Sequence, residues 1–60
     1  MGRPLAVVDA GDFHFELHKK EGGEHQILRS DISDPAHIPE EVKSEELPLQ
    51  VSNIFNRFMY

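Results

Sequence analysis

Residues 13–23 read FHFELHKKEGG, and this stretch decides the fold that the sequence predicts. Apolar and polar side chains alternate along its first half, so that Phe13, Phe15 and Leu17 share one face. A period of two is typical of a β-strand with one buried face. A helix over residues 12–21 is the alternative, but it would spread these apolar side chains around its circumference. The alternation therefore favours a strand.

The two glycines that end this stretch, Gly22 and Gly23, predict a tight hairpin turn, because both can adopt positive φ. If they alone form the turn, the hairpin covers residues 12–32 and compatible side chains lie opposite one another. The expected pairs are Leu17 with Leu28, Phe13 with Ile32, Glu16 with Arg29, and His14 with Asp31. This register leaves Ile27, opposite His18, as an apolar residue on the polar face.

The segments on either side of the hairpin are less regular. Residues 5–8 form a short apolar run before turn-forming residues, which predicts a third antiparallel strand, and Pro4 suits an edge. Residues 31–41 contain Pro35 and Pro39 and predict a loop. A short helix over residues 39–43 is an option there, because proline and acidic residues are favoured at helix starts.

The C-terminal segment predicts an amphipathic helix over about residues 45–59. Ser44 is a good N-cap, and Pro48 falls in the first turn, where a missing N–H is tolerated. The apolar residues recur at helical spacing and form one stripe, which consists of Leu47, Val51, Ile54, Phe55 and Phe58.

These elements predict a single small α+β domain over residues 1–60. It comprises a two- or three-stranded antiparallel sheet, made of the hairpin 12–32 with its Gly22–Gly23 turn, then a proline-containing loop and the C-terminal helix. A chain of 60 residues without cysteine has a small core and no disulfides, so we expect support from a partner or a second copy.

The composition disfavours several functional classes. The chain has 11 acidic and 6 basic residues and a net charge of −5, which disfavours direct nucleic-acid binding because phosphate contacts need clustered cations. No apolar run approaches the roughly 20 residues that span a bilayer, and no signal peptide is visible, so we expect a cytoplasmic protein without a membrane partner. We expect no enzyme activity and no small-molecule substrate, because no nucleophile motif is visible and the chain has little volume for a pocket.

The four histidines do not predict a metal centre. On a strand, His14 and His18 lie roughly 13 Å apart, which is too far to share one ion. We therefore expect surface histidines and no metal or other cofactor. A metal- or pH-responsive accessory protein that uses His14, His18 and His25 remains an alternative function.

The expected function is a non-enzymatic protein-binding module, a small acidic regulator, inhibitor or antitoxin-like protein that acts as a homodimer. A small subunit or fragment of a larger assembly is another alternative. Dimer contacts are expected along strand 4–9, strand 25–32 or the last helix, because unpaired strand edges bind other strands. Aromatic residues and methionine are enriched at interfaces. The predicted partner-binding residues are Phe55, Phe58, Met59, Tyr60 and Ile27.

Overall fold

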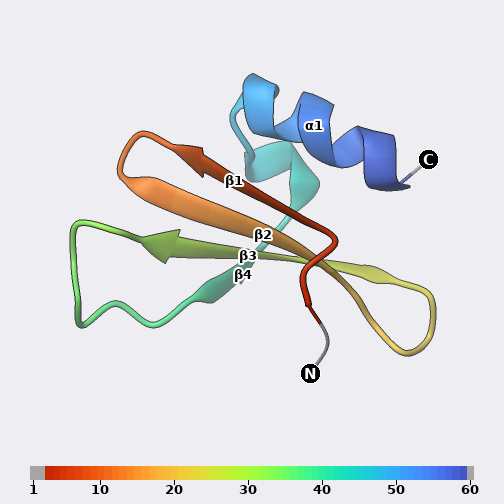
Figure 1. The fold of residues 1–60 in the computed structure, drawn as a ribbon, viewed down its shortest axis with the longest axis horizontal. Coiled ribbons are helices and arrows are strands. Elements are labelled where there is room, and N and C mark those ends of the chain that lie inside the picture. The colour runs from red at the N-terminus through yellow and green to blue at the C-terminus, as the bar shows by residue number, and fades with distance from the viewer. Residues whose placement is uncertain (1–2, 60) are drawn as a thin grey trace.

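The computed structural model describes residues 3–59, which form an antiparallel four-stranded sheet followed by a C-terminal helix (Figure 1). The strand order is β1-β2-β3-β4, so each strand pairs with its neighbour in sequence. The α+β class is confirmed, with one strand more than predicted. The elements are β1 (Ala6–Ala10), β2 (Phe13–Lys19), β3 (His25–Asp31), β4 (Glu40–Val42), the 3₁₀ helix η1 (Ser44–Glu46) and α1 (Leu49–Met59).

The register between β2 and β3 differs by one residue from the predicted one. Leu17 lies opposite Ile27, and Glu16 lies opposite Leu28. A shift of one residue moves every side chain of a strand to the other face of the sheet. Ile27 therefore faces the core rather than the polar side. None of the four predicted pairs forms, which were Leu17 with Leu28, Phe13 with Ile32, Glu16 with Arg29, and His14 with Asp31.

The turn between these strands explains the shift. The Lys20 N–H donates to the Glu24 carbonyl, so three residues rather than two form the loop. Of the two glycines in it, only Gly23 has a positive φ, of 88°. The Gly23 N–H also donates to the Lys20 carbonyl, which closes a tight turn before the glycine. A three-residue loop that ends with a left-handed glycine is a common hairpin connection.

A fourth strand, β4, occupies residues that the sequence predicts as loop or short helix. It pairs with β3, placing Glu40 opposite Arg29 and Val42 opposite Ile27. The Arg29 guanidinium donates to the Glu40 carboxylate and lies over the Phe13 ring, 5.2 Å from its centroid. These contacts explain why the segment is extended. They also make β3 an internal strand, so the prediction that residues 25–32 form an edge is wrong.

The helix α1 begins later than predicted. Its first residue is Leu49 rather than residue 45, because Leu47 is extended, with ψ of 146°. A residue that precedes proline avoids helical conformation, since the proline ring clashes with it. The Pro48 carbonyl then accepts the first helical bonds, from the N–H groups of Val51 and Ser52. Ser44 starts the short η1 helix instead of capping α1.

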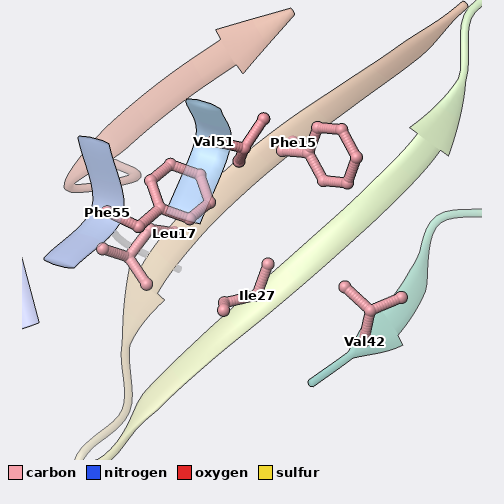
Figure 2. Close-up of a cluster of buried hydrophobic side chains, with 6 residues drawn as sticks. All are labelled: Phe15, Leu17, Ile27, Val42, Val51 and Phe55. Atoms are coloured by element: carbon pink, nitrogen blue, oxygen red, sulfur yellow. The ribbon is translucent and has the colours of Figure 1, made fainter. Parts of the chain in front are cut away.

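The core lies between the sheet and α1 (Figure 2). The turns of α1 that carry Val51 and Phe55 lie over the β1–β2 pair. Among the strands, β1 lies closest to α1, and its small residues Ala6 and Ala10 permit that approach. The buried apolar residues are Phe15, Leu17, Ile27, Val42, Val51 and Phe55.

The turn geometry predicts different outcomes for two adjacent substitutions. Gly23→Ala should lower the free energy of unfolding by about 1–2 kcal/mol, because a side chain disfavours left-handed backbone. Gly22→Ala is the matched control, because Gly22 lacks a positive φ and an added Cβ meets no atom within 4 Å at either glycine. Urea denaturation measures both. An equal loss of unfolding free energy in the two variants would contradict the three-residue loop.

Candidate functional site

The candidate site is a surface. Residues 3–59 form no detectable pocket, and they contain no group of three or more His, Asp or Glu side chains placed to hold a metal ion. In the same part of the chain, no helix is both long and apolar enough to cross a membrane.

The face of the sheet opposite α1, which we call the open face, contains no buried residue. Strand alternation places on it the side chains that α1 does not cover. At its centre Glu16 lies between Val7 on β1 and Leu28 on β3. The open face comprises Val7, Asp9, His14, Glu16, His18, Gln26, Leu28, Ser30 and Glu41.

Four of these side chains form a hydrogen-bonded row of alternating carboxylates and imidazoles. Asp9 Oδ1 and His14 Nδ1 are 2.5 Å apart, across the β1–β2 pair. Both Glu16 oxygens are used, because Oε2 lies 2.8 Å from His14 Nε2 and Oε1 lies 2.8 Å from His18 Nε2. Alternate residues of one strand are close enough for these contacts. The two histidines therefore meet Glu16 and not each other.

The position of His14 between two carboxylates determines its protonation. An imidazole can donate from both nitrogens only as the cation. The hydrogen bond to Asp9, followed by that to Glu16, raises the pKa of His14 above its ordinary value of 6.5. Reciprocally, the hydrogen bond from His14, followed by that from His18, lowers the pKa of Glu16. The row thus stabilises a charged His14 beside charged carboxylates.

Ser30 lies opposite His14 on β3, on the side away from Asp9. The order across the sheet is therefore Asp, His, Ser, which is also the composition of a hydrolase triad. Both His14 nitrogens are hydrogen-bonded to carboxylates, however. A cationic imidazole cannot accept a proton from a serine hydroxyl. This arrangement therefore favours an electrostatic role for His14 over that of a general base.

The predicted partner-binding residues are divided between the core and the surface. Phe55 and Ile27 are buried, so the predicted position of Ile27 on the polar face is wrong. Phe58 is 48% exposed, whereas Met59 packs against the core. Tyr60 lies outside the described residues. The shifted register instead places Leu28 on the open face, where sequence reasoning missed it.

The chain was compared with protein-family models, with curated proteins and with solved structures, and none of the three comparisons gives a match.

The histidine row predicts a bell-shaped dependence of stability on pH. The raised pKa of His14 means that its stabilising contribution is complete below pH 6.5 and is lost as the pH rises through the raised pKa. Glu16, with its lowered pKa, contributes above pH 4.5, and this contribution is lost as the pH falls through the lowered pKa. Urea denaturation across this range should show a maximum that His14→Gln flattens.

Asp9→Asn tests the cause of the His14 shift directly. The variant removes the carboxylate with the largest effect, so an NMR titration should show the pKa of His14 returning toward its ordinary value. Asp12→Asn is the matched control, because Asp12 follows β1 in the turn and its side chain has no hydrogen bond to His14. An unchanged His14 titration in Asp9→Asn would contradict the assigned bond.

Proposed function

We propose that this chain is a non-enzymatic protein-binding module, a small acidic regulator or inhibitor that binds a basic segment of a partner protein on its open face. The observation that carries the proposal is the composition of that face: acidic groups lie in the same rows as exposed or half-buried aliphatic side chains. Such a mixture is typical of interfaces, whose apolar centre supplies affinity and whose charges select the partner.

Aliphatic side chains flank Glu16 on both sides. Leu5 and Val7, at 42% and 50% exposed, lie on the β1 side of the sheet. Leu28, half-buried, lies on the other side of Glu16. Burial of an aliphatic side chain in a complex is favourable by about 25 cal/mol per Å². A partner segment with alternating aliphatic and basic residues matches this pattern.

Charge supports a basic partner. Glu41, on β4, lies on the same cross-strand line as Glu16 and Leu28, at the far edge of the sheet. The Glu41 carboxylate already attracts one cation of the chain itself, the Lys20 ammonium group at 3.7 Å. The chain as a whole carries a net charge of −5, so a basic segment is attracted to it at long range. Such attraction increases association rates and weakens with added salt.

A second candidate is a pH-responsive binding protein, favoured by the His14 position alone. At a pH above the raised pKa, His14 loses a proton and can no longer donate to both Asp9 and Glu16. One carboxylate is then released for a basic group of the partner. In this candidate, binding of the basic segment strengthens as the pH rises.

A capture experiment tests the binding proposal. The immobilised full chain is exposed to native lysate, and captured proteins are quantified by mass spectrometry. Leu28→Lys should abolish capture of the specific partners, because it adds a cation at the centre of the open face and removes an aliphatic contact. Ile38→Lys is the matched control, since Ile38 is an 80% exposed aliphatic residue in the loop before β4.

If both variants are folded by circular dichroism and capture the same proteins as the unaltered chain, the open face is not the binding surface.

A further inference from the structure

We propose that a second copy of this chain binds along the free edge of β1, forming one continuous antiparallel sheet, while the two α1 helices contact each other through Ile54 and Phe58. The inference uses a different surface from the open face and depends on the proposed function only in assigning protein binding to the chain. It is carried by the β1 edge, by the neutralisation of its one charge, and by the exposed flank of α1.

The two edges of the sheet differ in how they are protected. Natural edges avoid unwanted pairing by being short, charged or interrupted by proline. β4 is three residues long and two of them are glutamates, Glu40 and Glu41. β1 has five residues, AVVDA, without lysine or proline and with one charge. Within residues 3–59 only β2 pairs with it, so its outer backbone groups have no strand partner.

The one charge on β1 does not prevent pairing of two copies. Like charges on opposed strands repel, and two chains of net charge −5 would repel each other at long range. Asp9, however, lies 2.5 Å from the ring of His14, whose cationic form balances the carboxylate. The β1 seam is therefore locally close to neutral. Glu41 and Glu40 at the opposite edge are likewise paired, with Lys20 and Arg29, so strand length rather than charge distinguishes the two edges.

The sequence of β1 is suited to pairing with itself. In an antiparallel pair, opposed residues lie on the same face of the sheet. A two-fold axis at Val8 opposes Val8 with its own copy, Ala6 with Ala10, and Val7 with Asp9. The alanines lie on the helix side, where a small side chain leaves room for a second helix. No large or unpaired charged side chain meets its own copy in this register.

The helix supplies the remaining apolar surface. Phe58 and Met59 lie on opposite flanks of the buried stripe of α1, yet Met59 packs against the core while Phe58 is 48% exposed. The Met59 flank therefore faces the centre of the sheet, and the flank that carries Phe58 and Ile54 faces the β1 edge. Ile54 and Phe58, four residues apart, are neighbours on a helix surface.

The position of α1 brings the two helices to the same seam. Of the four strands, β1 lies closest to α1, so pairing of two β1 edges places both helices beside the two-fold axis. A stable interface buries about 800 Å² per partner, which a five-residue edge cannot supply by itself. Both elements are required.

Sedimentation of the full chain, up to the millimolar range, tests the inference. The expected result is a monomer–dimer equilibrium that Phe58→Lys weakens tenfold or more, with Ile54→Lys as a second variant in case the first fails to fold. Leu49→Lys is the matched control, because Leu49 is 77% exposed on another side of the same helix. Hydrogen exchange of β1 amides should slow as the concentration rises.

Three results would overturn the inference. They are a monomer at every concentration, a dimer that neither helix variant weakens, or a dimer in which exchange of the β1 amides does not depend on concentration. Leu28→Lys distinguishes this proposal from the binding proposal, because it lies on an internal strand and should leave the dimer intact while it abolishes capture of partners.

Discussion

The left-handed conformation of Gly23 is the constraint on which the rest of the structure depends. It closes the β2–β3 turn with three residues, and the loop length determines which side chains of β3 face the helix. Ile27 consequently packs opposite Leu17, and Leu28 lies on the open face. A loop shorter by one residue would exchange these two side chains and would take Arg29 away from its contacts with Phe13 and Glu40. The division of the β3 side chains between core and surface thus follows from this turn.

The elements with a clear periodicity could be predicted from the sequence, and those without one could not. The alternation in β2 and the apolar stripe of α1 each identify a buried face. On β3, Ile27 and Leu28 are adjacent and both apolar, so the sequence contains no preference between two registers. Residues 40–42 are too short to show a period, and their strand exists because β3 offers Arg29 and Ile27 as partners. The length of the turn decided the first point, and tertiary contacts decided the second.

The same distinction holds for the candidate site. The alternation correctly places His14, Glu16 and His18 on one face, because that property belongs to β2 alone. The carboxylate opposite His14 depends on the pairing of other strands, and it is Asp9 rather than the predicted Asp31. Glu16 lies between His14 and His18 and within hydrogen-bond distance of both, a contact that the spacing of the two histidines alone does not indicate. Local pattern identified the residues but not their bonding partners.

The order of the strands has a consequence for how the chain folds. Every strand pairs with its neighbour in sequence, so the sheet can form from local hairpins, which close quickly because the intervening loops are short. Small sheets are marginal until a helix covers their apolar face, however, and α1 follows all four strands in sequence. During synthesis on the ribosome, Phe15 and Leu17 therefore remain exposed to water until Val51 and Phe55 have emerged. The nascent sheet is therefore the stage at which exposed apolar surface and unpaired strand edges favour aggregation.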